Sequence, residues 1–255
     1  MKGRASYRTR DRKKVRSPVR ARRAETQFAA KLKGVAREVG RLIGSFDVVS
    51  NPETVPTLRT MLAKYAEALQ PWATSVVSRM LAEVNQRDER MWATQAQEMG
   101  IALRKELHNA PTGQVMRQLM AEQVQLITSL PTEAAQRVHD LVIKGMEDSA
   151  RADEVAREIL RSGEVTESRA KLIARTEVAR SASALTQARA QHIGSTQYIW
   201  RTSGDSDVRP GHRAMNGKVC EWANPPAVDE NGRVMHHHPG AIWNCRCYPE
   251  PIIPE

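Results

Sequence analysis

Apolar residues recur every three or four positions along most of the first 193 residues, which is the period of an amphipathic helix. This pattern predicts helices over residues 25–45, 58–109, 115–131, 132–147, 151–161 and 166–193. We expect a boundary at Pro71, because proline lacks an amide donor and clashes with the preceding turn of a helix. Pro131 is expected to end another helix, and Gly163 to be a C-cap. This part of the chain is therefore predicted to be almost entirely α-helical.

The pattern changes after Gly194. Tyr198, Ile199 and Trp200 predict a short strand, and Gly, Pro, Asn, Asp and His are frequent from there onward. Few apolar residues can form a core in this part: Tyr198, Trp200, Val219, Trp222, Ile242, Trp243 and Tyr248. A metal or a buried ion pair would have to supplement so small a core. We therefore predict a mainly α N-terminal region, residues 24–160, followed by a small α+β C-terminal domain with short strands, residues 161–255.

Positive charge is concentrated at the start of the chain. Residues 1–23 account for the whole formal net charge of +10, and the remainder is balanced. Besides Lys2, the basic residues of this segment are Arg4, Arg8, Arg10, Arg12, Lys13, Lys14, Arg16, Arg20, Arg22 and Arg23. A segment with so few apolar residues cannot bury enough surface to fold, so we predict a disordered arm. Such an arm could neutralise DNA phosphates, act as a solubilising tail, or dock on an acidic protein surface.

No stretch of the sequence approaches the roughly 20 apolar residues that cross a bilayer, and the basic start lacks the apolar segment of a secretory signal. We therefore expect a soluble protein that is made in the cytoplasm.

The three cysteines all follow residue 219. An odd number of cysteines in a chain of 255 residues favours thiols or metal ligands over a disulfide framework.

Histidines and cysteines gather near the end of the sequence in a pattern that suggests zinc. The predicted ligands are His212, His238, Cys245 and Cys247, and Cys220 offers a further sulfur. The Cys-x-Cys spacing differs from the usual two-residue gap of zinc sites, and the histidine run has no characteristic spacing to it. The alternative interpretation is therefore buried thiols and hydrogen-bonded histidines.

A catalytic interpretation uses some of the same residues. Asp205, Asp207 and His212 could act as hard ligands or acid–base groups of a metal-dependent nuclease, with His236 or His237 as the general base. The competing interpretation is turn chemistry, because aspartates in a loop commonly accept hydrogen bonds from nearby backbone amides. The sequence contains no glycine-rich phosphate loop and no nucleophile elbow.

Two interpretations are open for Arg175 and Glu177, which lie on a predicted helix. Glu177 could form a surface pair with Arg180, three residues further along. Alternatively, Arg175 or Glu177 could reach across to the loop of residues 207–209 and tie the helix to the C-terminal domain.

The order of these motifs resembles that of the Mu F-type minor head proteins of tailed phages, also called head morphogenesis proteins. The resemblance covers about residues 115–250. It rests on the string from Ile173 to Glu177, on the string from Asp207 to His212, and on two closing strings, residues 238–240 and 244–247. The structural motif residues that it implies are Arg175, Glu177, Trp200, Asp207, Arg209 and Gly217.

The resemblance implies a low-copy protein inside the phage head, near the portal vertex, that acts in assembly or DNA delivery and has no settled enzymatic activity. The expected partners are the portal protein, capsid or scaffold proteins and packaged double-stranded DNA, with no membrane in the assembled state. The expected location is the virion, and the host cytoplasm during assembly. Some members carry a toxin domain after this region, and we expect none in this chain.

Overall fold

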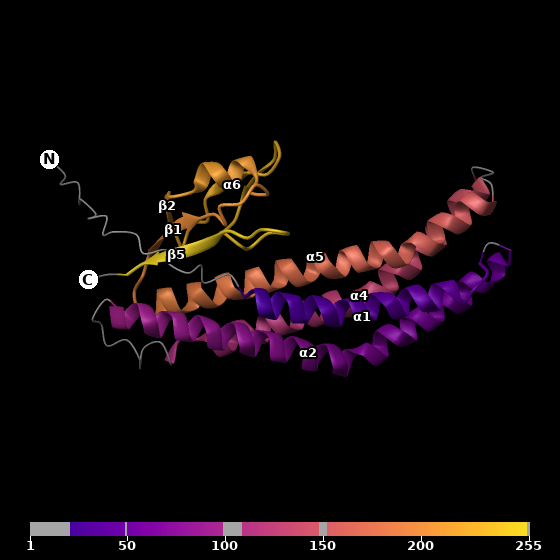
Figure 1. The fold of residues 1–255 in the computed structure, drawn as a ribbon, viewed down its shortest axis with the longest axis horizontal. Helices are drawn as coiled ribbons and strands as arrows, with labels where there is room; N and C mark the ends of the chain where they lie inside the picture. Colours follow the sequence, from indigo (N-terminus) through magenta and orange to yellow (C-terminus); the bar gives the residue numbers. More distant parts are fainter. Residues whose placement is uncertain (1–20, 49, 99–108, 148–151, 254–255) are drawn as a thin grey trace.

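The computed structural model describes residues 21–48, 50–98, 109–147 and 152–253 (Figure 1). The long helices of this part are α1 (Arg22–Gly44), α2 (Val55–Glu98), α4 (Thr112–Glu147) and α5 (Ala152–His192), and a short 3-10 turn, η1 (Pro52–Thr54), precedes α2. The smaller elements that follow are β1 (Gln197–Arg201), α6 (Pro210–Met215), β2 (Val219–Glu221), β3 (Ala227–Asp229), β4 (Val234–His236) and β5 (Tyr248–Ile252). The predicted fold class is thereby confirmed.

The long helices form an elongated bundle in which α1 lies along α5 and α2 lies along α4. Each helix turns an apolar stripe inward; in α1 the stripe includes Phe28, Leu32, Val35, Val39 and Ile43, all buried. The small C-terminal region lies against one side of the bundle, toward one end, and contacts α5 through β5 (Figure 1). In the described part of the chain, no helix has the length and apolar character that crossing a bilayer requires.

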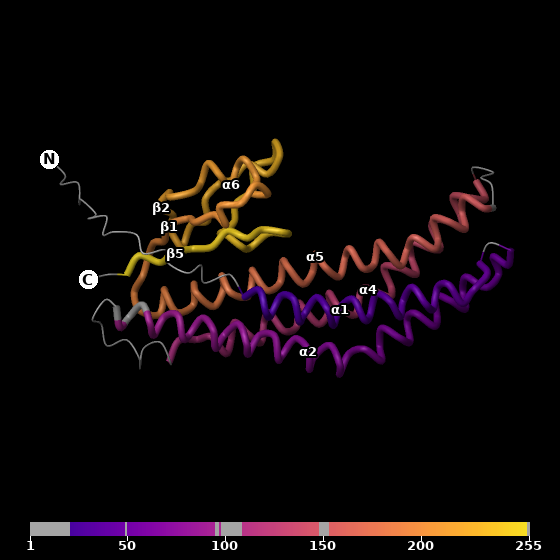
Figure 2. Tube along the Cα trace, in the orientation of Figure 1, coloured from indigo at the N-terminus to yellow at the C-terminus, as the bar shows by residue number. Residues whose placement is uncertain are grey.

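Two predicted helix boundaries at prolines are wrong. Pro71 lies inside α2 and Pro131 lies inside α4. Pro71 is on the exposed side of its helix, where water can hydrate the carbonyl group that proline leaves without a partner. Figure 2 shows that α2 bends along its length, which is the usual response of a helix to an internal proline. Packing on both sides of each proline outweighs the local cost of a missing hydrogen bond.

Gly163 is not a C-cap, because it lies within the uninterrupted helix α5. A Cβ atom at Gly163 would lie 3.2 Å from the Cα of Gly40, so the two glycines let α5 and α1 approach closely. The predicted domain boundary between residues 160 and 161 also falls inside α5. The helices predicted over 151–161 and 166–193 are therefore one element that links the bundle to the C-terminal region.

The C-terminal region contains a three-stranded antiparallel sheet in the order β2-β1-β5 and a separate β3-β4 hairpin. Its buried core includes Tyr198, Trp200, Trp222 and Ile242, as predicted. The expected core residues Val219 and Trp243 are instead 52% and 51% exposed. Tyr248 packs partly buried against the core of the bundle. Trp92 of α2 and Ala190 of α5 complete the C-terminal core, so the long helices supply apolar surface that the small region lacks.

The basic residues from Arg4 to Arg20 lie outside the described residues. Arg22 and Arg23, which we assigned to the disordered arm, are exposed residues in the first turn of α1. The helix begins this early because Ala21 and Ala24 are buried and extend the apolar stripe of α1 toward the N-terminus.

A buried ion pair joins α2 to α5. Arg189 and Asp88 are 2% and 3% exposed, and Nη1 of Arg189 donates a hydrogen bond to Oδ2 of Asp88. The hydroxyl of Thr186 donates to the other Asp88 oxygen over 2.5 Å, and Nη2 of Arg189 donates to Oδ1 of Asn85 over 2.9 Å. These contacts balance both charges within the bundle.

Candidate functional site

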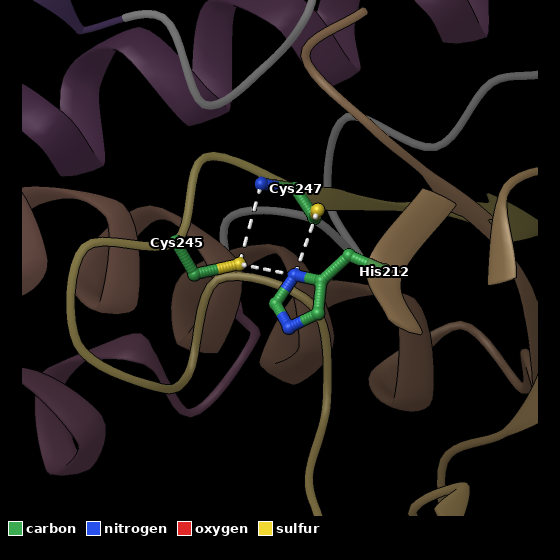
Figure 3. A group of neighbouring side chains, drawn as sticks. All are labelled: His212, Cys245 and Cys247. Atoms are coloured by element: carbon green, nitrogen blue, oxygen red, sulfur yellow. Dashed lines mark hydrogen bonds between the residues drawn. The ribbon is translucent and has the colours of Figure 1, made fainter. Parts of the chain in front are cut away.

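His212, Cys245 and Cys247 meet in the interior of the C-terminal region (Figure 3). His212 comes from α6, and the two cysteines come from the segment that leads into β5. Nδ1 of His212 lies 3.3 Å from Sγ of Cys247 and 3.4 Å from Sγ of Cys245. Each of the three residues is 2% exposed. The structure therefore places three of the four predicted metal ligands within contact distance of one another.

Glu230 sets the orientation of the His212 ring. Its Oε1 atom accepts hydrogen bonds from Nε2 of His212 and, over 3.0 Å, from Nε2 of His237. Its Oε2 atom lies 3.3 Å from Nη1 of Arg209, which supplies a positive charge to this buried carboxylate. Because an ionised carboxylate only accepts hydrogen bonds, the proton of neutral His212 is on Nε2. The lone pair of Nδ1 then faces the two sulfur atoms.

The two sulfur atoms have different environments. The backbone amides of Gly240 and Cys247 both donate to Sγ of Cys245 over 3.4 Å. The hydrogen bond from the Cys247 thiol lowers the pKa of Cys245 to about 4, and the same contact raises the pKa of Cys247. Burial alone would lower the pKa of His212, but its hydrogen bonds with Cys245 and Glu230 outweigh burial and raise it. The cluster thus favours negative charge on Cys245.

A tight backbone contact places His212 beside Glu230. A Cβ atom on Gly211 would lie 2.0 Å from the carbonyl oxygen of Asp229, so only glycine allows α6 to pack this closely on β3. The β3-β4 hairpin turns at Asn231 and Gly232, whose φ angles are 58° and 88°. Positive φ at both central residues is typical of the tight turns that connect hairpin strands.

The segment that carries the cysteines is held on α5. Nη1 of Arg175 donates to Oδ1 of Asn244 over 2.9 Å, and the amide of Asn244 donates to the hydroxyl of Thr176 over 2.9 Å. The hydroxyl of Ser183 donates to the carbonyl of Pro239 over 2.7 Å. The predicted contact from α5 to the C-terminal domain therefore exists, but its target is Asn244 and not the loop of residues 207–209.

Glu177 is neither a surface residue nor a link to that loop. It is 4% exposed and accepts a hydrogen bond from Nε2 of Gln123 over 3.2 Å within the bundle. One of its oxygens lies 3.7 Å from Nη1 of Arg180. Burial raises the pKa of Glu177. Within this motif, Arg175 therefore contacts the segment that carries the cysteines, whereas Glu177 contacts a neighbouring helix of the bundle.

His238 and Cys220 lie apart from the cluster. Nδ1 of His238 is 2.9 Å from the hydroxyl of Tyr198, and burial lowers the pKa of this histidine. Cys220 is buried beside the same tyrosine, with its Sγ 3.8 Å from the carbonyl oxygen of Lys218. Of the residues His236 to His238, it is His237 that faces Glu230.

The residues proposed for a nuclease do not converge. Asp205 and Asp207 accept hydrogen bonds from Nη2 of Arg246 over 2.9 and 3.0 Å. Asp205 also accepts from the amide of Asp207, which is the turn chemistry weighed against catalysis. His236 is exposed and faces the carbonyl of Pro225. Within the described residues, no group of potential metal ligands combines these aspartates with His212.

The remaining motif residues pack around the cluster. Trp200 is fully buried and packs edge-on against His212, with ring centroids 5.5 Å apart. Gly217 has a φ of 85° and donates its amide to the carbonyl of Trp200 over 2.8 Å. Arg209 donates to the carbonyl of Trp243 over 2.9 Å in addition to its contact with Glu230. These motif residues position the side chains of the cluster.

Glu230 is the site residue that the sequence interpretation missed, and His237 was considered there only as a general base. The dipeptide Asn231-Gly232 is a strong hairpin signal and could have placed Glu230 at the end of a strand. No local signal shows that its carboxylate turns inward, because that depends on how the hairpin docks on Gly211.

Comparison with known proteins identifies this part of the chain. Residues 136–249 match the family described as phage Mu protein F like protein. Over this segment the chain is similar to the phage Mu F-like family. The match begins within α4 and ends in β5, so the Mu F-like segment includes all of α5, the anchored cysteine segment and the cluster. The resemblance to head morphogenesis proteins is thereby confirmed.

A protein of Haemophilus influenzae whose name states no function is 35% identical over 155 residues. The aligned part is 60% of this chain and 33% of that protein, so the chain spans about a third of the length of this relative. No solved structure matches the chain significantly.

Replacing Gly211 by alanine is expected to lower the free energy of unfolding of the C-terminal region by about 3 kcal/mol or more, because the new methyl group overlaps a backbone carbonyl. Urea unfolding followed by tryptophan fluorescence will measure the change. The matched control is Gly34→Ala in α1, where no atom lies within 4 Å. There, alanine should stabilise the helix by about 0.5–1 kcal/mol. Equal behaviour of the two variants would refute the assigned role of Gly211.

Proposed function

We propose that this protein is a minor head protein of a tailed phage that acts inside the head, near the portal, in assembly or DNA delivery. The observation that carries the proposal is the Mu F-like match over residues 136–249, which indicates a phage head morphogenesis protein. The contact of Arg175 with Asn244 agrees with a structural role, because it ties the C-terminal region to a long helical bundle.

The portal protein and capsid or scaffold proteins are the partners that such a role requires. The elongated bundle offers long helical faces, and the C-terminal region at one end offers a separate surface (Figure 1). An infection in which this protein is absent should yield defective or empty heads, and supplying the wild-type chain should restore filled particles. Normal yields of filled, infectious particles without the protein would contradict the proposal.

We further propose that the basic segment before α1 contacts packaged DNA. Positive charge concentrated in residues 1–23, together with a body of balanced charge, suits binding to phosphates without sequence readout. Within the virion, this segment would lie against a very high density of phosphate groups.

We propose a structural and not an enzymatic role for the C-terminal region. The two aspartates considered as catalytic acids, Asp205 and Asp207, form ion pairs with Arg246. His212 is buried between Glu230 and two cysteines. Incubation of the purified protein with duplex DNA and magnesium or zinc should give retention of intact DNA. DNA cleavage that His212→Ala abolishes would contradict this proposal and favour a nuclease.

A further inference from the structure

We propose that His212, Cys245 and Cys247 bind one zinc ion through Nδ1 of the histidine and the two sulfur atoms. These three ligand atoms lie within 4.8 Å of one another, and all three residues are buried. Thiolate and imidazole groups are the ligands that zinc prefers, whereas magnesium and calcium prefer oxygen. The inference concerns the stability of the C-terminal region and is independent of the proposed role in the phage head.

The hydrogen bonds behind His212 support this assignment. A histidine that ligates a metal commonly donates its other ring N–H to a carboxylate, which fixes the tautomer and the direction of the ring. Nε2 of His212 makes this contact with Glu230, and Arg209 lies on the other oxygen of the same carboxylate. The lone pair of Nδ1 is then directed at the two sulfur atoms (Figure 3).

A second group of potential ligands, His212, Glu230 and His237, is less suitable. Nδ1 of His237 faces the carbonyl oxygen of His238 over 3.0 Å, and its Nε2 faces Glu230 over 3.0 Å. The two ring nitrogens of His237 thus face oxygen atoms of the protein, whereas Nδ1 of His212 faces two sulfur atoms. We therefore assign Glu230 and His237 to the orientation of His212 and not to direct coordination.

Charge balance favours a divalent ion at this position. Two thiolates neutralise Zn²⁺, and Arg209 neutralises Glu230, so the occupied site carries no net charge in the protein interior. The amides of Gly240 and Cys247 donate to the sulfur of Cys245, as expected for a sulfur that carries negative charge. Binding displaces the remaining protons of the ligand cluster to solvent and involves no oxidation or reduction.

The metal would hold α6 to the segment before β5. In the described part of the chain, no fourth His, Cys, Asp or Glu completes the group, so we assign the fourth position to a water molecule. The apolar core of this region is small, and a structural metal contributes folding free energy to such a domain.

The test uses the full-length protein, purified without chelators. Elemental analysis should give one zinc per chain, and exchange for Co²⁺ should give the sulfur-to-cobalt charge-transfer band of a thiolate-bound ion. Cys245→Ser and Cys247→Ser should lose this stoichiometry, whereas Cys220→Ser, the matched control, and His238→Asn should keep it. Glu230→Gln keeps all three ligands and should weaken zinc affinity by about 10–100-fold, as is usual when the partner of a ligating histidine is changed.

Three results would overturn the assignment. One is a folded wild-type protein that contains no zinc and gives no charge-transfer band with Co²⁺. Another is equal metal loss in Cys220→Ser and Cys245→Ser. The third is loss of zinc from His238→Asn with retention in a folded His212→Asn variant, which would place the metal at the histidine next to Tyr198. The cobalt spectrum of the wild type decides the question even where a cysteine variant fails to fold.

Discussion

Replacing Asp88 by alanine is expected to lower the free energy of unfolding by about 3–5 kcal/mol, because it leaves the buried guanidinium of Arg189 without its partner. The pair joins α2 to α5 where both side chains are almost fully buried. Urea unfolding followed by far-ultraviolet circular dichroism will report the change, since these helices dominate the signal.

Two controls separate the buried charge from general effects of substitution. Glu158→Ala removes an exposed partner of Arg161 and should change stability by less than about 1 kcal/mol. The double variant Asp88→Leu with Arg189→Met removes both charges and should recover much of the stability that Asp88→Ala removes. If Asp88→Ala is no more destabilising than Glu158→Ala, the buried pair does not have the role that we assign to it.

Deleting residues 2–20 is expected to abolish most binding to duplex DNA. For the wild type, affinity should fall by about 10³–10⁵-fold between about 50 and 200 mM salt if six to ten phosphates are neutralised. For every phosphate that the shortened chain no longer neutralises, the slope of log affinity against log salt should become shallower by about 0.9. The deletion ends before Ala21, so the buried first turn of α1 is kept. Fluorescence anisotropy with a labelled duplex will measure both quantities.

A scrambled version of the same segment is the matched control. Because phosphate contacts depend on charge and not on sequence, the scrambled chain should bind DNA as the wild type does. Unchanged DNA affinity after deletion would assign binding to the folded body. Loss of binding in the scrambled variant would instead indicate that a specific order of residues within the segment is required.

Much of the fold could be predicted from the sequence, because the spacing of apolar residues reflects which helix faces are buried. The spacing identified every long helical region in the described residues, and the run from Tyr198 to Trp200 identified β1. The breaks assigned to Pro71, Pro131 and Gly163 were wrong for a common reason. The local cost of proline or glycine is about 1–3 kcal/mol, and packing along neighbouring helices exceeds it.

The candidate site could be predicted only in part. Residue type selected His212, Cys245 and Cys247, but it could not choose among three adjacent histidines, and His238 faces Tyr198 instead. Glu230 gave no chemical signal, because its role depends on a hairpin that docks against Gly211. The contact between Arg175 and Asn244 likewise joins residues far apart in the sequence, and only the tertiary fold brings them together.

The most direct test of the proposed function is quantitative mass spectrometry of purified phage particles and of empty precursors from an infection that produces this protein. We predict a small and reproducible number of copies in each particle, and their presence in precursors would indicate incorporation during assembly. Complete absence of the protein from both filled particles and precursors would contradict a minor head protein.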